Sequence, residues 1–353
     1  MTLIFFQNCI SPHQIPYIRE CAKDKRINKV YLLVPRIDYQ TRIGMGWDSS
    51  NLLIGTSIIC NIKPSNENIT NLLKTNTNSY CFFSGIRADT DVFHWFKMSL
   101  SYNVKRYIIT EPPFTYNKPL WMHYIRFYLL DYKYIKYING VFGIGQAATN
   151  YYKKISKKWK VFPFQYVTES TNRSSYHIEF NSKLKLLFVG NLSPRKNVRV
   201  VLKALETLHD IEFTIVGDGE EYNFLQKNAI QKNLPITFLG KKQMDKIPNI
   251  MESHDVLILP SLHDGWGAVV NEAMTLGLYV IVSDKCGAKD LISNKTLGII
   301  FKNDNAIDLR QQLVYCINNK NNIRKGINYR IEHNRIIQGP VVAQYFINCL
   351  KQS

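Results

Sequence analysis

The chain of 353 residues is 45% hydrophobic, which supplies enough apolar material for the cores of two domains and excludes a mainly disordered protein. Its 45 Lys and Arg residues exceed the 27 Asp and Glu residues, so the formal net charge is +18 and anionic ligands or surfaces are expected as partners. The seven cysteines form no CxxC pair, which argues against a zinc site and against a disulfide framework.

No export signal or membrane-spanning segment is expected from the sequence. The chain starts with a short apolar run, Pro12 interrupts it early and the first basic residue is Arg19, whereas secretory signals begin with basic residues and a longer apolar core. The uncharged stretch 137–152 contains several Asn, Gln and Gly residues, so it is too polar to cross a bilayer. These features predict a cytoplasmic protein.

Apolar, β-branched runs alternate with helical patterns along the chain, which predicts an α/β fold with parallel sheets. In the second half each run ends at a Gly, Pro or Ser, as in a doubly wound domain whose ligands bind beyond the carboxyl ends of the strands. A polar stretch at 168–183 is the expected linker, and apolar residues at helical spacing predict a C-terminal helix over 339–350. The expected strands are Leu3–Phe6, Val30–Val34, Tyr80–Phe83, Tyr107–Ile109 and Val141–Ile144, and then Leu184–Val189, Phe213–Val216, Ile236–Leu239, Val256–Leu259 and Tyr279–Val282.

Positive charge and aromatic side chains concentrate in residues 116–160, which hold nine basic residues and a single acid, Asp131. Trp and Tyr favour the water–lipid interface and basic residues favour anionic leaflets, so this segment predicts contact with a membrane. The same mixture suits single-stranded nucleic acid, or a solvated basic face whose aromatic rings belong to the core. The aromatic residues include Tyr116, Trp121, Tyr124, Phe127, Tyr128, Tyr132, Tyr134, Tyr137, Tyr151, Tyr152 and Trp159.

Two loops in the second half carry residues suited to a phosphorylated ligand. After the first of the later runs come Gly190 and Asn191, and then Arg195 and Lys196 directly before a helical pattern. Adjacent cations at a helix start bind phosphate through charge-assisted hydrogen bonds and the helix dipole, although most basic turns bind nothing. The next loop, 217–220, holds two glycines that permit close backbone approach and an Asp that can cap the following helix.

The loop from Asp264 to Glu272 carries the strongest signal for chemistry. Gly265 and Gly267 leave backbone N–H groups uncovered at the start of a helix, where an anion can bind. The two acids are eight residues apart, about two helical turns, so both can lie along one side of a ligand and bind sugar hydroxyls. The structural alternative makes Asp264 a capping acid and Glu272 a buried ion-pair partner. Another glycine-containing loop follows at 283–290, and several such loops at one sheet edge favour a single cleft.

The order and spacing of these elements between Leu186 and Phe301 resemble the retaining glycosyltransferase family 4, or glycosyl transferases group 1, over about a third of the chain. The resemblance implies the GT-B fold, with two facing, doubly wound Rossmann-like domains and a C-terminal helix that returns to the N-terminal domain. The implied parts are an acceptor-binding domain at 1–167, a linker at 168–183, a nucleotide-sugar domain at 184–335 and the returning helix at 336–353. The matching pieces are Phe188–Asn197, Val216–Glu220, Phe238–Gly240, His254–Ser261 and Asp264–Met274.

At the matching positions of this chain, the resemblance implies that Arg195 and Lys196 hold the donor diphosphate and that Glu272 binds the ribose hydroxyls. Asp264 would contact the transferred sugar. The family usually has Glu at that place, so the shorter Asp implies a changed donor position or a different sugar. Asn191 stands where a phosphate-binding Arg is common, which leaves more of the anion to the two cations. The full implied donor set is Gly190, Asn191, Arg195, Lys196, Gly217, Asp218, Gly240, Gly265, Trp266, Gly267, Ala268, Val269 and Glu272.

Three residues are candidates for the reaction itself, and Asp264 is the first. His13 lies in the loop after the first strand, which in GT-B enzymes approaches donor and acceptor, although a capping or surface histidine is the alternative. Glu111 follows the 107–109 strand, where many family members have a histidine, and can serve as an acceptor-side acid or base. No metal is expected, because fixed cations can stabilise the departing diphosphate and the Asp-Thr-Asp at 89–91 lies in the other half of the chain.

The sequence therefore predicts a retaining, metal-independent hexosyltransferase without a cofactor, whose donor is a nucleoside diphosphate sugar, with UDP favoured over GDP. The retaining outcome rests on the resemblance alone. The expected acceptor is a lipid-linked glycan of polysaccharide or lipopolysaccharide biosynthesis, at the inner face of the cell membrane. Residues 116–160 would face the anionic lipid surface, and no nucleic acid partner is expected. The alternatives are a transferase with a soluble acceptor and a non-catalytic polyanion-binding protein.

Overall fold

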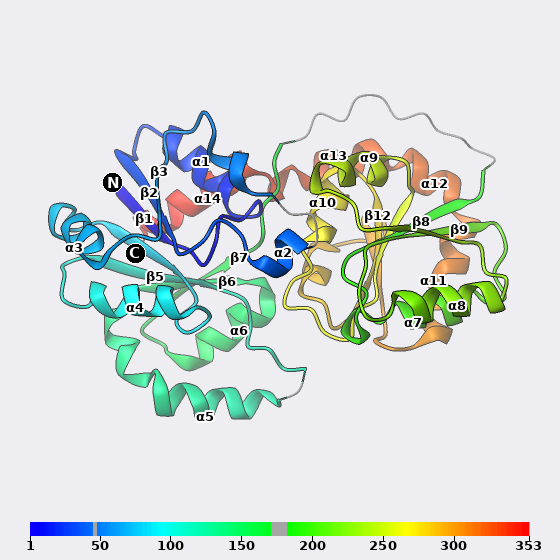
Figure 1. The fold of residues 1–353 in the computed structure, drawn as a ribbon, viewed down its shortest axis with the longest axis horizontal. Coiled ribbons are helices and arrows are strands. Elements are labelled where there is room, and N and C mark those ends of the chain that lie inside the picture. The colour runs from blue at the N-terminus through cyan, green and yellow to red at the C-terminus, as the bar shows by residue number, and fades with distance from the viewer. Residues whose placement is uncertain (45–47, 117, 171–181, 353) are drawn as a thin grey trace. The chain divides into compact units, whose positions relative to one another are not determined.

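The structure is a computed structural model, which describes residues 1–44, 48–116, 118–170 and 182–352 (Figure 1). The chain divides into two compact units. The first consists of residues 1–40, 48–169 and 337–353, and the second is formed mainly by residues 170–336. Most of the expected linker, residues 171–181, lies outside the described residues, and the domain bounds drawn from the sequence stay a prediction.

The first unit contains a seven-stranded parallel sheet with the strand order β3-β2-β1-β4-β5-β6-β7. Its central strands are runs of buried aromatic and branched side chains, as expected where helices cover both faces of a sheet. The strands are β1 (Thr2–Phe6), β2 (Lys29–Val34), β3 (Ile59–Ile62), β4 (Tyr80–Ser84), β5 (Lys105–Thr110), β6 (Gly140–Ile144) and β7 (Lys160–Phe164).

Helices pack on both faces of this sheet because neighbouring residues of a strand point to opposite sides. The Phe5 ring lies 6.0 Å from that of Phe346 in α14, whereas the Phe6 ring lies 5.9 Å from that of Trp95 in α4. The helices are α1 (Ile15–Lys23), α3 (Asn66–Thr75), α4 (Thr90–Ser99), α5 (Leu120–Leu130), α6 (Gly145–Ile155) and α14 (Gly339–Lys351), and a short helix α2 (Gln40–Gly44) follows β2.

Local capping fixes where several of these helices begin. Ser65 and Asn68 form a reciprocal capping box at the start of α3, and the Asp89 carboxylate accepts from the first backbone N–H groups of α4. Pro340 stands in the first turn of α14, where a missing N–H breaks no helical hydrogen bond. Helix α14 packs against α1, which confirms the C-terminal helix that returns to the N-terminal part of the chain.

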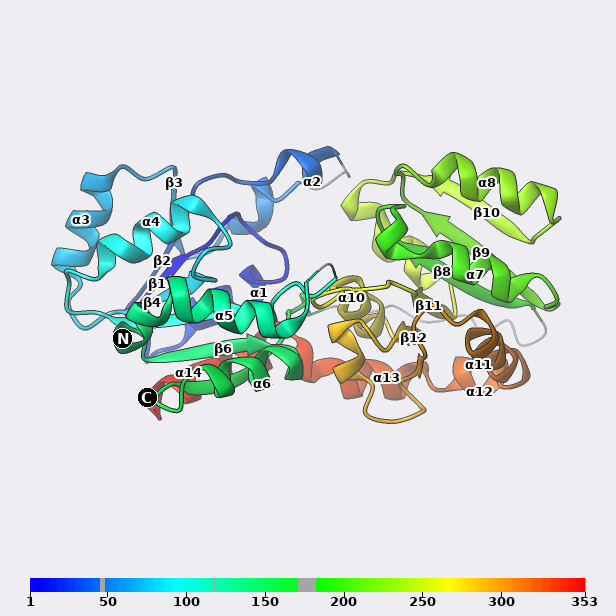
Figure 2. The same cartoon turned by 90° about the horizontal axis from the view of Figure 1, so that it is seen from below.

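The second unit contains a six-stranded parallel sheet with the order β10-β9-β8-β11-β12-β13. Helix α7 packs against α8 and α11, and α10 packs against α9 and α13, on the opposite side of the sheet (Figures 1 and 2). The elements are β8 (Leu184–Val189), α7 (Val198–Leu205), β9 (Ile211–Val216), α8 (Tyr222–Gln231), β10 (Ile236–Gly240), α9 (Ile247–Glu252), β11 (Val256–Leu259), α10 (Val269–Thr275), β12 (Tyr279–Ser283), β13 (Gly298–Phe301), α11 (Ala306–Asn318), α12 (Lys320–Lys325) and α13 (Ile327–His333).

The expected α/β class with two doubly wound, Rossmann-like parallel sheets is confirmed. All ten strands expected from the sequence are present, but the sequence analysis missed β3, β7 and β13. Each of these three is an edge strand of its sheet. Three of the four residues of β3 are exposed, and β7 contains Pro163. Edge strands lack a neighbour on one side, so their side chains need not form a continuous apolar run.

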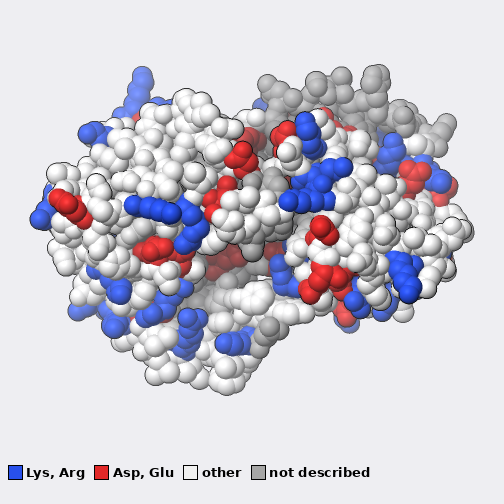
Figure 3. Space-filling model, viewed as in Figure 1, with Lys and Arg blue, Asp and Glu red and all other residues white. Residues whose placement is uncertain are grey.

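Charged side chains are distributed over both units on the face seen in Figure 3, with Lys and Arg more frequent than Asp and Glu. No helix of the described residues is both long and apolar enough to span a bilayer.

Candidate active site

The loops that follow β8, β9, β10, β11 and β12 meet along the carboxyl edge of the second sheet, where backbone hydrogen bonds tie each loop to a neighbour. The convergence expected from the sequence is therefore present. The bonds join Gly217 N–H to Gly240 O (2.9 Å), Gly190 N–H to Val216 O (3.0 Å), Leu192 N–H to Asp218 O (2.9 Å), Leu262 N–H to Arg195 O (2.8 Å) and Asp264 N–H to Lys285 O (3.2 Å).

The two adjacent cations and the first acid of the expected site are in contact. Arg195 and Lys196 lie in a 3-10 turn that ends at Asn197, whose left-handed backbone (φ 51°) leads into α7. Lys196 Nζ donates to Asp264 Oδ2 at 2.6 Å, and both side chains are only 15% exposed. Arg195 Nη1 lies 3.6 Å from the same oxygen and donates to His263 O at 2.7 Å. One carboxylate thus balances two cations at the sheet edge.

The loop 264–268 is shaped by a glycine and anchored by a tryptophan. Gly267 has φ of +100°, and a Cβ there would lie 2.4 Å from Leu259 Cδ2, so a larger residue would displace the loop. The Trp266 side chain is buried, and its indole N–H donates to Asn271 Oδ1 at 2.6 Å. Trp266 is one of the residues expected to contact a donor, but its side chain belongs to the core.

Glu272 lies closer to the loop than the sequence analysis predicted. Helix α10 begins only at Val269, so Glu272 is in its first turn, and the eight-residue separation from Asp264 is mostly loop rather than two helical turns. Ala268 and Val269 stand at the junction between this loop and α10. Burial raises the pKa of the Glu272 carboxyl from its ordinary value of 4.5 to about 7. This acid can therefore be either protonated or ionised near neutral pH.

The glycine loops after β8 and β9 approach each other too closely for side chains. A Cβ on Gly217 would lie 1.9 Å from Gly190 O, which requires glycine at that position. The sequence suggested that Asp218 caps the following helix, but the structure shows that it does not. Its carboxylate accepts from Gly219 N–H at 2.7 Å, and α8 begins only at Tyr222. The Asn191 and Asp218 side chains are exposed at this edge.

In the first unit, His13 and Glu111 are joined by a residue that the sequence analysis missed. The buried His13 ring lies 5.6 Å from the Tyr166 ring, and the Tyr166 hydroxyl donates to Glu111 Oε1 at 2.6 Å. These residues follow β1, β5 and β7, so they share the carboxyl edge of the first sheet. Tyr166 was missed because β7, which carries it to this edge, was not recognised as a strand.

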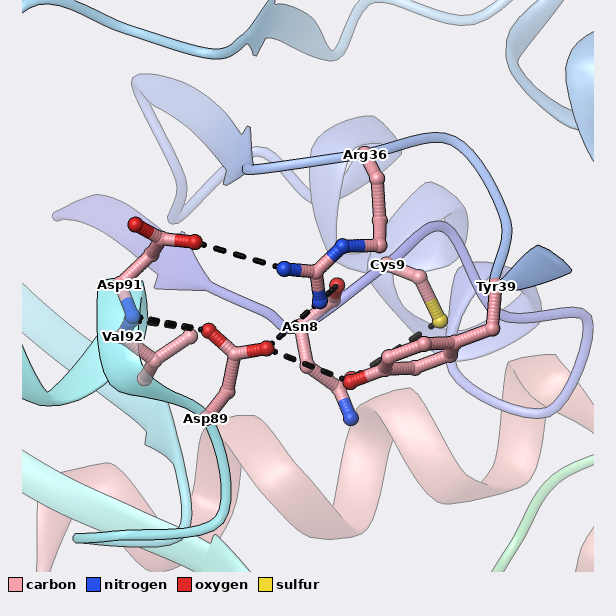
Figure 4. Close-up of polar contacts among 7 residues, drawn as sticks. All are labelled: Asn8, Cys9, Arg36, Tyr39, Asp89, Asp91 and Val92. Atoms are coloured by element: carbon pink, nitrogen blue, oxygen red, sulfur yellow. Dashed lines mark hydrogen bonds and ion pairs between the residues drawn. The ribbon is translucent and has the colours of Figure 1, made fainter.

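A second polar cluster lies at the same edge, beyond β1, β2 and β4 (Figure 4). Arg36 Nη1 donates to Asp89 Oδ2 at 2.6 Å and to Asn8 O at 3.3 Å, and the Tyr39 hydroxyl donates to the same Asp89 oxygen at 3.3 Å. Burial alone would raise the pKa of Asp89, but its hydrogen bonds with Arg36 and with the α4 N-terminus hold that pKa below the ordinary value. The Asp89 carboxylate thus both pairs with Arg36 and caps the start of α4.

Within the described residues, no group of three or more His, Cys, Asp or Glu side chains is placed to hold a metal ion.

Residues 172–333 match the model of a protein family described as glycosyl transferases group 1. Within this segment, which is somewhat less than half of the chain, the protein is similar to the glycosyl transferases group 1 family. An uncharacterized glycosyltransferase of Methanocaldococcus jannaschii is 30% identical over 135 residues, which cover 38% of each chain. The UDP-Gal:alpha-D-GlcNAc-diphosphoundecaprenol alpha-1,3-galactosyltransferase of Escherichia coli is 36% identical over 121 residues, which cover 32% of this chain and 31% of the relative. The chain thus spans well under half the length of these two relatives.

Two solved structures resemble the whole chain. Anabaena HepE in complex with UDP gives a TM-score of 0.73 at 13% identity and 100% coverage of both chains. The lipopolysaccharide outer core galactosyltransferase WaaB gives a TM-score of 0.70 at 14% identity, with 100% of this chain and 99% of the other covered. At such identities the likeness shows the fold, and it confirms the GT-B fold expected from the sequence.

The raised pKa of Glu272 predicts how stability depends on pH. Between pH 5 and 7 the folded carboxyl keeps its proton while the unfolded one has lost it, so the free energy of unfolding falls as pH rises through this window. Glu272→Gln removes this titration, and the stability of the variant relative to the wild type should rise by about 2 kcal/mol from pH 5 to 7.5. Urea unfolding at several pH values measures the difference, and parallel pH profiles would contradict a proton-binding Glu272.

Proposed function

We propose that this protein is a retaining, metal-independent glycosyltransferase that moves a hexose-type sugar from a UDP-sugar to a glycan acceptor. The contact between Lys196 and Asp264 carries the proposal, because it puts a cation suited to a diphosphate beside an acid suited to a sugar hydroxyl. Glu272, in the first turn of α10, is the proposed partner of the ribose hydroxyls. The glycine loops between them let backbone approach the donor closely.

The choice of UDP over GDP is supported by the proteins that this chain resembles. The Escherichia coli relative is named for UDP-Gal, and the Anabaena structures of similar fold are described as complexes with UDP, UDP-glucose, or UDP and glucose. The glycosyl transferases group 1 segment contains all the residues proposed to bind the donor. Retention of the anomeric configuration is proposed from the family resemblance alone.

Charge development explains how the proposed residues would accelerate transfer. As the glycosidic bond to the donor breaks, negative charge grows on the departing nucleoside diphosphate, and fixed cations bind this charge more tightly in the transition state than in the ground state. Before the donor binds, Asp264 neutralises Lys196 and Arg195. The diphosphate then takes over these cations, which releases the Asp264 carboxylate to accept a hydrogen bond from the sugar.

The acceptor is proposed to be a lipid-linked glycan bound by the first unit, in the synthesis of a cell-surface polysaccharide or lipopolysaccharide. The Escherichia coli relative is named for a diphosphoundecaprenol-linked acceptor, and so is a Campylobacter jejuni relative that is 28% identical over 186 residues. An acceptor of this kind would place the protein at the inner face of the cell membrane. His13, Tyr166 and Glu111 form the polar group at the sheet edge that is proposed to handle the acceptor hydroxyl and its proton.

Lys196→Ala tests the proposed role of the cation in donor chemistry. The variant should transfer sugar from a UDP-sugar about 100-fold to 1000-fold more slowly, because the leaving diphosphate loses one of its two proposed fixed charges. Radiolabelled transfer to an undecaprenyl-diphosphate-linked sugar measures the rate, and the wild-type rate should persist in EDTA. Lys203→Ala, on the exposed side of α7, is the matched control and should keep full activity. Wild-type turnover by Lys196→Ala would refute the proposed donor site.

Tyr166→Phe tests the proposed acceptor-side group. Removal of the hydroxyl takes one hydrogen bond from Glu111, so the acidic limb of the kcat profile should shift and kcat should fall by about tenfold, with the KM for the donor unchanged. Tyr345→Phe loses a hydroxyl that donates to Pro163 O elsewhere in the first unit and serves as the control. An unaltered pH profile in Tyr166→Phe would remove Glu111 from the proposed mechanism.

A further inference from the structure

Helix α5 is mainly apolar, yet most of it is exposed. Among its eleven residues, Leu120 to Leu130, the only charged residue is Arg126 and the only fully buried side chain is Phe127. A helix with apolar side chains on most of its surface normally buries them in a protein core or in a membrane. The exposed helix therefore needs a partner on its outer side.

One side of α5 is fastened to the first unit by aromatic contacts. The Phe127 ring packs edge-on against that of Trp159 at 5.9 Å, and the Tyr124 ring lies 4.7 Å from that of Tyr151 in α6. The Tyr151 hydroxyl also donates to His123 O in α5 at 3.1 Å. These contacts fix which face of α5 points inward.

The opposite side of α5 forms an apolar outer face. With 3.6 residues per turn, Ile125 and Leu129 project away from Phe127, with Trp121 and Met122 beside them one turn earlier. Leu129 is 78% exposed, Trp121 62% and Ile125 50%. Figure 1 shows α5 along the lower edge of the first unit. The outer face of α5 is defined here as Trp121, Met122, Ile125 and Leu129.

Residues 116–160, which contain α5, carry exposed cations, and the one acid among them is buried and paired. The single acid of residues 116–160, Asp131, is buried and accepts from Arg87 Nε at 2.6 Å. In Figure 3 the edge of the first unit that carries α5 is largely uncharged, with Lys and Arg atoms beside it. The exposed basic residues of this segment are Lys118, Arg126, Lys133, Lys136, Lys153, Lys154, Lys157, Lys158 and Lys160.

We infer that the outer face of α5 inserts into the interfacial region of an anionic phospholipid bilayer. Apolar and aromatic side chains of an interfacial helix enter the boundary between headgroups and acyl chains, while neighbouring Lys and Arg residues bind anionic headgroups. A second copy of this chain fits less well, because pairing through α5 would bring two basic segments together without acids between them. Single-stranded nucleic acid fits less well because the outermost side chains are apolar rather than charged.

This inference deepens the proposed function and rests on it for its biological setting, because a membrane-bound face would bring the first unit to a lipid-linked acceptor. Its test uses no donor and no acceptor, so vesicle binding and sugar transfer can fail independently of each other. Vesicle binding without sugar transfer would contradict only the proposed transferase activity. Sugar transfer without vesicle binding would contradict only the insertion of α5 into a membrane.

Flotation of the full chain with phosphatidylcholine vesicles, with and without 30% phosphatidylglycerol, measures the binding. Ile125→Gln/Leu129→Gln should weaken partition to anionic vesicles by at least about tenfold, because two exposed apolar side chains no longer enter the lipid. Ile54→Gln/Ile230→Gln replaces two side chains that are each 75% exposed elsewhere and should leave binding unchanged. Because all four side chains are exposed, both double variants should fold.

Charge and depth are tested with the same vesicles. Lys133→Gln/Lys136→Gln should lower partition by about fivefold per lysine, whereas Lys241→Gln/Lys242→Gln in the second unit should not. Brominated acyl chains should quench tryptophan emission in the wild type and much less in Trp121→Phe. Equal binding by wild type and Ile125→Gln/Leu129→Gln would overturn the inference. The inference would also be overturned if the chain did not bind vesicles and instead formed a dimer that depends on α5, or bound an oligonucleotide in a salt-sensitive way.

Discussion

The ion pair between Lys196 and Asp264 is the interaction on which the candidate active site depends. Both residues lie in loops with little regular structure, so their meeting at 2.6 Å requires the backbone bonds that tie the loops after β8, β11 and β12 together. Gly217 and Gly267 permit the close approaches within this set of loops. The result is a largely buried lysine whose charge is balanced by a neighbouring carboxylate at the sheet edge.

The sequence was sufficient to predict the interior strands of both sheets and the edge strand β10, but not the other three edge strands. Strands such as β11 and β12 are buried on both faces, so they stand out as unbroken apolar runs that end at a proline or a serine. The edge strands β3, β7 and β13 pair with a neighbour on one side only. The sequences of β3 and β7 are mixed, and β13 is an apolar run of only four residues. The pairing of these strands follows from the sheet already formed rather than from their own composition.

The site was predictable where its residues are close in sequence. Arg195, Lys196 and the loop from Asp264 to Glu272 lie within short segments whose residue types already indicate phosphate and sugar binding. Tyr166 was not predictable, because its contact with Glu111 joins residues 55 positions apart through an edge strand. Local geometry also escaped the sequence analysis: α10 starts later than expected, and Asp218 closes its own turn instead of capping α8.

Titration calorimetry of UDP binding to Asp264→Asn tests most directly whether Asp264 holds the cations for a diphosphate. If Lys196 and Arg195 are released when the carboxylate is neutralised, the variant should bind UDP about tenfold more tightly than the wild type while losing sugar transfer. Asp245→Asn, whose exposed carboxylate pairs with Lys246, should bind UDP as the wild type does. Weaker UDP binding by Asp264→Asn, or no change, would contradict a cation pair balanced by Asp264.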